Sequence, residues 1–177
     1  MVSGYLDRIN GMLVQPQTTL KSLQEAPLRS AFIHFLLVWE IFAALFCLGG
    51  LGLNLFVPTT DPWYPVEFVV LVLAGWLFFG LVVHAVLRVV SGQKSVGNTC
   101  RAVLYAATPL AAIGWMPVIG GLSFIWGLLL MNQGLVEYHG ISGRTAAAVL
   151  FLSLVLGIMA FGMAYYFLPL AITLLIR

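Results

Sequence analysis

One acidic residue, Glu40, lies inside a long apolar stretch that runs from Ser30 to Thr60. A charged side chain at the centre of a bilayer costs about 2.5 to 3.5 kcal/mol on insertion scales, so we expect Glu40 to face the interior of a helical bundle. Two interpretations of this residue remain open. Glu40 relays protons or cations, or it is a neutral acid hydrogen-bonded to a neighbouring helix, for instance to Asn132.

A second candidate site surrounds Pro109. Proline forfeits one helical hydrogen bond, so Pro109 should bend its helix and free a carbonyl group near Tyr105 for a hydroxyl, a water molecule or an ion. Thr108 lies beside this bend. Broken helices form binding sites in transporters, and a kink that serves only packing is the alternative interpretation.

The three histidines, His34, His84 and His139, fall near the inner ends of predicted membrane spans. None has the i, i+4 spacing of paired metal ligands, so we predict polar contacts at headgroup level and no metal site. The few polar residues also offer no nucleophile with a base, no carboxylate pair and no cofactor loop. We therefore expect a protein that is not an enzyme and has no cofactor.

The composition indicates what surrounds these residues. Of the 177 residues, 62% are hydrophobic and 8% are charged, and the mean hydropathy is +1.05. Typical soluble domains are about half apolar and a quarter charged, so this chain is an integral membrane protein whose surface faces a lipid bilayer. The net charge of +2 comes without a basic cluster, and no nucleic-acid partner is expected.

We predict an all-α integral membrane fold with five transmembrane helices. Residues 1–29 form a cytosolic or interfacial segment, and residues 30–177 form the transmembrane domain. Helix boundaries follow from charges, prolines and the length of about 20 residues that a span needs. The predicted spans are 31–57, 67–88, 101–116, 118–137 and 145–168.

The sequence predicts specific features for the third and fourth spans, for the last helix and for the N-terminal segment. The stretch from Ala102 to Val136 has no formal charge and is too long for one span, so it should turn back near Pro117. A re-entrant pair that does not reach the far side of the membrane is the alternative to two spans. Pro169 should kink or end the last helix. In the N-terminal segment, apolar residues recur every three or four positions, which indicates two short amphipathic helices with their apolar sides in the headgroup region. A solvated segment that leads into the first span is the alternative.

The positive charges orient the chain. With five spans and a cytoplasmic N-terminus, seven of the eight Lys and Arg residues lie on the inner side, and only Arg177 lies outside. This distribution obeys the positive-inside rule and puts the C-terminus on the opposite side of the membrane.

Small residues recur four positions apart in the later spans, as in the pairs Ser123 with Gly127 and Ser153 with Gly157. Such spacing lets helix backbones approach closely. Packing within one bundle is the default interpretation of these pairs, and self-association into a homo-oligomer is the alternative.

The central and later parts resemble the Yip family of membrane proteins that interact with Ypt/Rab GTPases. The resemblance rests on an ordered series of short segments: Gln15-Pro16, Ser91 to Gly97, Arg101 to Tyr105, Thr108-Pro109, Met116 to Gly120, Ile125-Trp126, Gly134-Leu135, His139 to Ser142, and Arg144 to Ala146. It implies five membrane helices and a cytosolic N-terminus. Relatives that act in vesicle traffic have a longer hydrophilic N-terminal region, so this chain looks more like the compact prokaryotic members.

The resemblance also implies a class of function. We expect a non-enzymatic scaffold or partner-binding subunit of the trafficking type, in the cytoplasmic membrane of a prokaryote. Its expected partners are other membrane proteins or further copies of itself. The short N-terminal segment argues against a GTPase partner. The alternative function is a small transporter or channel that uses Glu40 and the Pro109 break.

Overall fold

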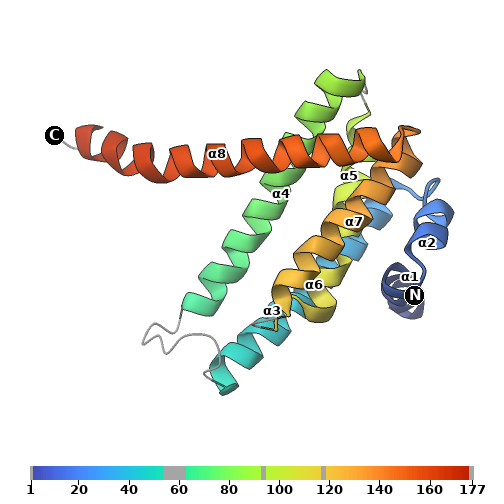
Figure 1. Ribbon diagram of the computed structural model, residues 1–177. Helices are drawn as coiled ribbons and strands as arrows, with labels where there is room; N and C mark the ends of the chain where they lie inside the picture. The colour runs from blue at the N-terminus through green and yellow to red at the C-terminus, as the bar shows by residue number, and fades with distance from the viewer. Residues whose placement is uncertain (1, 54–62, 93–94, 117–118, 176–177) are drawn as a thin grey trace.

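A computed structural model describes residues 2–53, 63–92, 95–116 and 119–175. Every element in these ranges is an α-helix (Figure 1). The helices are α1 (Val2–Val14), α2 (Pro16–Ser22), α3 (Leu28–Leu53), α4 (Tyr64–Ser91), α5 (Val96–Ala106), α6 (Thr108–Ile113), α7 (Gly120–His139) and α8 (Gly143–Leu175). The all-helical prediction is therefore confirmed for the described part of the chain.

Among the described residues, three helices are long and apolar enough to cross a membrane. Their candidate spans are Leu28–Leu48, Tyr64–Ser91 and Gly143–Met163. They agree with the first, second and last predicted spans, although residues 54–57 lie outside the described part. Gly92 ends α4 in the left-handed conformation with φ +67°, a role that glycine performs without strain.

Pro169 does not end α8, which continues to Leu175. Of the two expectations for Pro169, a kink or an end, the end does not occur, because one proline removes a single backbone hydrogen bond, and membrane helices tolerate that loss.

The predicted hairpin of the third and fourth spans takes a different form. The 101–116 segment contains two helices, α5 and α6, and α5 already begins at Val96. The fourth predicted span corresponds to α7, which packs along both of them. Pro117 lies outside the described residues. Asn132, Gln133 and Glu137 lower the hydropathy of the second half of α7, which is not among the three candidate spans.

The N-terminal helices form as predicted, but their apolar sides pack against protein. Met12 of α1 and Leu20 of α2 are almost fully buried, and Leu23 directly after α2 is also buried. Helix α1 contacts α6, and α2 contacts α7. The same periodicity serves a helix that packs on a bundle, and the location of α1 and α2 at the headgroup level stays a prediction.

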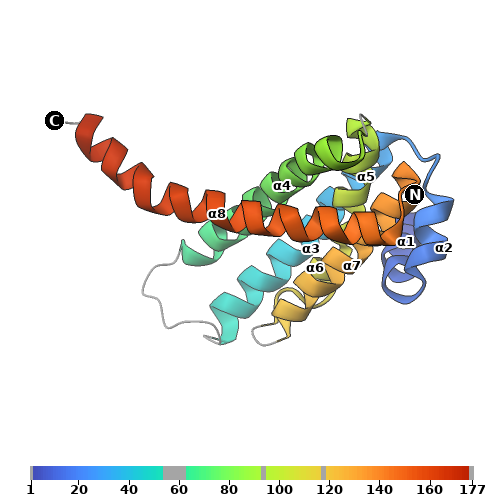
Figure 2. The ribbon, with the colours of Figure 1, turned by 45° about the horizontal axis from the view of Figure 1, so that its top comes forward.

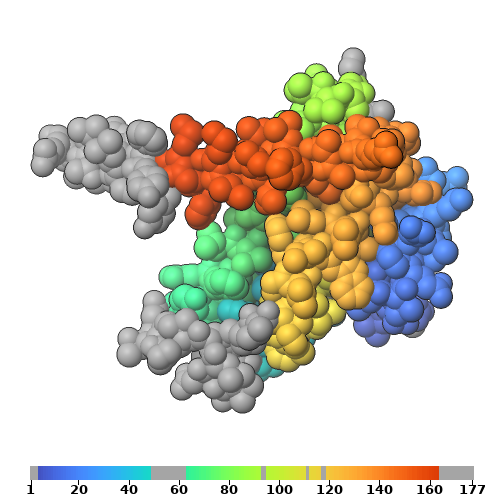
Figure 3. Space-filling model, in the orientation of Figure 1, coloured from blue at the N-terminus to red at the C-terminus, as the bar shows by residue number. Residues whose placement is uncertain are grey.

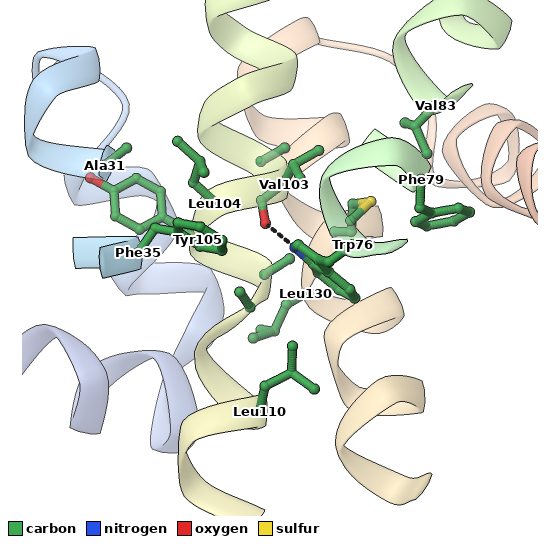
Figure 4. Close-up of a cluster of buried hydrophobic side chains, with 14 of the residues drawn as sticks. Ala31, Phe35, Trp76, Phe79, Val83, Val103, Leu104, Tyr105, Leu110 and Leu130 are labelled. Carbon is green, nitrogen blue, oxygen red and sulfur yellow. Dashed lines mark hydrogen bonds between the residues drawn. The ribbon is translucent and has the colours of Figure 1, made fainter. Parts of the chain in front are cut away.

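The core lies among α3, α4, α5 and α7, and Figure 4 shows its centre. Trp76 of α4 is buried, and its indole Nε1 donates a hydrogen bond to the Val103 carbonyl of α5 at 3.1 Å. A buried indole N–H needs such an acceptor. This bond fixes α4 against the helix that positions the polar residues described below.

Helix α8 crosses α4 and α7 and then extends away from the bundle, so that the C-terminus lies far from the other helices (Figures 1 and 2). Large apolar side chains are exposed along it, including Phe151, Ile158 and Phe161. Helix α4 likewise exposes Leu71 and Leu81. Apolar exposure on this scale is the surface of a protein surrounded by lipid rather than by water.

Candidate functional site

Pro109 begins a new helix rather than bending an existing one. Helix α5 ends at Ala106, α6 begins at Thr108, and Pro109 lies in the first turn of α6. A proline in a first turn costs no backbone hydrogen bond, because the first N–H groups of a helix have no acceptor within it. The predicted kink is thus a break between two helices.

The Thr108 hydroxyl closes this break. Its Oγ1 donates to the Tyr105 carbonyl at 2.7 Å, and His34 Nε2 of α3 lies 3.0 Å from the same oxygen. A hydroxyl has one proton, and this one is already donated to Tyr105, so His34 Nε2 must be the donor in the second bond. The carbonyl that the sequence analysis expects to be free is therefore occupied by a hydroxyl, and the structure brings together His34, Tyr105, Thr108 and Pro109.

Two further polar atoms lie buried in this cluster. The rings of His34 and Tyr105 are tilted against each other with centroids 5.1 Å apart. His34 Nδ1 has no hydrogen-bond partner among the described residues, whereas Tyr105 Oη lies within reach of the Ser30 side chain. A buried polar atom without a partner costs about 1 to 3 kcal/mol, so the cluster is not optimised for stability alone. Nearby, Arg8 donates to Ser30 Oγ and joins α1 to the start of α3.

A second polar cluster lies toward the C-terminal ends of α4 and α7. Thr99 Oγ1 is 3.0 Å from His84 Nδ1 and 3.1 Å from His139 Nε2. The hydroxyl has one proton, which can also go to the Ser95 carbonyl at 3.4 Å, so at least one of the two ring nitrogens must be a donor. Burial, followed by the nearby charge of His84, lowers the pKa of His139, the last residue of α7. Two histidines thus share one hydroxyl, an arrangement that spacing along the chain does not reveal.

Glu40 belongs to neither cluster. Its side chain lies on the exposed side of α3, with Leu36 and Ala44 one turn away on either side. The expectation that Glu40 faces the bundle interior was wrong. Helix α3 turns Phe35, Val38 and Phe42 toward the core instead, because these larger apolar side chains fill the space against α5 and α6.

Asn132 is also separate from Glu40. Asn132 is half-buried on α7 and lines a groove between α7 and α2, together with Gln133 and Glu137. The expected bond between Glu40 and Asn132 does not occur. The structure therefore does not unite Glu40, the Pro109 break and Asn132 in one interior site.

The first predicted small-residue pair lies inside the bundle. Ser123 is buried and donates to the Gly120 carbonyl. A Cβ atom on Gly127 would lie 2.9 Å from the Trp76 ring and 3.0 Å from the Ala106 carbonyl oxygen. Gly127 thus allows α7 to approach α4 and α5 closely.

The second pair joins α8 to α4. Ser153 is fully buried, and its hydroxyl donates to the Val149 carbonyl at 2.7 Å. The position of a Cβ atom on Gly157 would be 4.0 Å from the Phe79 ring, an ordinary packing distance. Both pairs therefore contribute to packing within one bundle.

The described residues contain no group of three or more His, Cys, Asp or Glu side chains that could hold a metal ion. Cys47 and Cys100 are both free thiols.

A comparison with protein families matches the Yip1 domain over residues 10–175. The chain belongs to the Yip1 domain family. The search of curated proteins and the search of solved structures give no match. Both histidine clusters, Glu40 and the groove beside Asn132 lie within the matched Yip1 domain. The domain begins inside α1, so the packed N-terminal helices are largely part of it.

Within this Yip1 domain, the sequence did not single out Thr99 or place Glu137 in a groove beside α2. Ser95 caps α5 by accepting a hydrogen bond from the Asn98 backbone N–H. A serine followed by the polar residues Asn98 and Thr99 is an N-terminal helix signal that could have placed Thr99 near the C-terminal end of α4. No signal in the sequence pairs Glu137 with α2, because that contact depends on how α2 packs.

Proposed function

We propose that this Yip1 domain protein is a non-enzymatic scaffold or partner-binding subunit of the membrane, and that it assembles with a second copy of itself through α3. One observation carries the proposal: Glu40 lies exposed near the middle of a membrane-spanning helix without an ion pair or hydrogen bond to any described residue. Ionisable residues inside membranes almost always pair or face a protein interior. The missing partner is therefore supplied by another chain.

The surface around Glu40 has the spacing of a helix pair. A series of residues lies along one side of α3 at intervals that alternate between four and three positions, and none of these residues is buried. We name these residues the α3 seam: Ile33, Leu37, Glu40, Ala44 and Cys47. This period of 3.5 residues keeps one side of a helix against a partner helix. Ala44, one turn from Glu40, permits close approach of the backbones.

A second copy matches the chemistry of this seam. A neutral carboxyl group is both a donor and an acceptor, so two such groups related by a two-fold axis can bond to each other. The described part of the three candidate spans offers no cation at this depth, because Arg29, Arg88 and Arg144 lie within three residues of the inner ends of their spans. Two copies inserted in the same direction bring Glu40 opposite its equivalent.

The proposal includes a five-span topology. Helices α5 and α6 together form the third crossing and α7 the fourth, with the N-terminus cytoplasmic and the C-terminus on the opposite side, in the cytoplasmic membrane of a prokaryote. The support is the distribution of positive charges, since seven of eight basic residues then lie inside.

Cysteine crosslinking in native membranes tests the α3 contact. In a Cys100→Ser variant, Cys47 is the only cysteine and lies in the seam. We expect oxidation to produce a crosslinked dimer, and Glu40→Gln, which keeps a donor and an acceptor, to preserve it. Glu40→Leu should reduce the crosslinked fraction.

A matched control moves the cysteine to α4. Leu71→Cys, in a chain with both native cysteines replaced by serine, lies on an exposed surface seven residues from Tyr64 at the end of α4, and Cys47 lies six residues from Leu53 at the end of α3. We expect little crosslinking there. Equal crosslinking at positions 47 and 71 indicates random collision and contradicts the proposal, as does a complete lack of dimer at Cys47.

A further inference from the structure

The groove between α2 and α7 is a separate feature, independent of the α3 seam. Its volume is about 590 Å³. Two hydrogen bonds hold its walls together: Tyr138 Oη donates to the Leu20 carbonyl at 3.2 Å, and Gln24 Nε2 donates to the Glu137 carbonyl at 3.3 Å. In the space-filling view the N-terminal helices lie against α7 (Figure 3). The groove is thus preformed by direct contacts.

The α7 wall of this groove presents hydrogen-bond acceptors. Asn132 Oδ1 and Gln133 Oε1 are buried and have no hydrogen-bond partner among the described residues. Glu137 follows Gln133 by one helical turn and lines the same groove. Buried acceptors without donors are costly, so this wall suits a ligand that brings several N–H groups.

The α2 wall contributes a positive charge, opposite in sign to the charge of a Glu137 carboxylate. Lys21, in the last turn of α2, lines the groove opposite the α7 acceptors. An ammonium group is a compact cation that binds phosphate oxygens. A ligand that fits both walls therefore has a cationic N–H donor at one end and a phosphate at the other.

We infer that this groove binds the headgroup of a phospholipid whose phosphate carries a primary amine, as in phosphatidylethanolamine. The ammonium group donates its three hydrogens to Asn132, Gln133 and Glu137, and the phosphate lies against Lys21. Lipid rather than a free phosphoamine is the source, because the groove lies at the membrane surface. Gly143, the first residue of the last candidate span, also lines it.

The same geometry discriminates between headgroups. Choline has three methyl groups on its nitrogen and no N–H donor, so it leaves the acceptors of α7 unpaired. A site built to hydrogen-bond a ligand group rejects an analogue that lacks it, because its own polar atoms are then buried without partners. Phosphatidylglycerol lacks the cation altogether and faces the Glu137 carboxylate.

Lipid-dependent thermal protection of the full chain in detergent tests this inference. Phosphatidylethanolamine and phosphatidylcholine with identical acyl chains are titrated into the purified protein. We expect half-maximal protection at a concentration about tenfold lower for the ethanolamine lipid. Equal protection by the two lipids overturns the inference. Equal protection by soluble phosphoethanolamine overturns the assignment to lipid.

Single substitutions test which wall of the groove binds the ammonium group and which binds the phosphate. Asn132→Leu or Glu137→Gln should abolish the preference for ethanolamine, and Lys21→Gln should weaken protection by both lipids because both carry the phosphate. Glu67→Gln is the matched control, since it removes the same charge from an exposed site on α4. If the preference survives both changes in α7, the ammonium group does not bind there, and the inference is wrong. Phosphatidylglycerol is titrated in the same way. If it protects the protein as well as phosphatidylethanolamine does, the inference is also wrong.

Discussion

His34 Nε2 lies 3.0 Å from the Thr108 hydroxyl and joins α3 to the start of α6 in the buried part of the bundle. The hydroxyl in turn donates to the Tyr105 carbonyl at 2.7 Å. One oxygen atom thereby links three helices at the point where α5 ends. Substitution of Thr108 therefore tests how these hydrogen bonds stabilise the break between α5 and α6.

Thr108→Val removes the hydroxyl and keeps the shape of the side chain. The Tyr105 carbonyl and His34 Nε2 then lose their partner, so we expect a loss of about 1 to 3 kcal/mol in the free energy of unfolding. The measurement is thermal unfolding of the purified protein in detergent. Thr108→Ser keeps the hydroxyl and should lose less. If Val and Ser lower the stability equally, the hydrogen bonds are not the cause.

Gly127→Ala tests the close approach of α7 to α4 and α5. The added Cβ atom would meet the Trp76 ring and the Ala106 carbonyl oxygen at about 3 Å, so we expect a destabilisation of about 1 to 3 kcal/mol. Gly121→Ala is the control, because nothing lies within 4 Å of its Cβ position. That change should be neutral or slightly stabilising, since alanine favours a helix. Equal unfolding temperatures for the two variants would show that Gly127 is not tightly packed.

The pH dependence of stability tests the cluster around Thr99. His139 follows the predicted 118–137 span, and its folded pKa is lowered from 6.5. Above pH 6.5 the ring is neutral in both states. Below it the unfolded chain binds the proton more readily, so stability should fall until the folded pKa is passed. His139→Gln should flatten this part of the stability curve. An unchanged slope in the variant would assign the dependence to other groups.

Much of the fold follows from the sequence, for reasons visible in particular residues. Charges at Arg29, Glu67, Arg88 and Arg144 mark where apolar helices meet water, so the three long helices were predictable. The cluster of His34, Tyr105 and Thr108 was partly predictable because a proline inside an apolar segment forces a rearrangement of backbone hydrogen bonds.

Other features depend on packing that a single sequence does not encode locally. Glu40 is flanked by apolar residues on all sides of α3, so its position along the chain does not reveal which side packs inward. The meeting of His84 and His139 at Thr99 joins three separate helices. The apolar stripe of α1 fits a membrane surface and a helical bundle equally well, and only the contact with α6 distinguishes them.

The central claim is that two copies of this Yip1 domain protein pair through Glu40. Förster transfer between donor-labelled and acceptor-labelled copies in vesicles measures this association directly as the protein is diluted with lipid. We predict that transfer falls reversibly on dilution and that Glu40→Leu weakens association about tenfold, since an interhelical hydrogen bond contributes about 1 to 2 kcal/mol in membranes. Glu40→Gln should associate nearly as well as the natural chain. Identical dilution curves for the natural chain and Glu40→Leu would contradict the account.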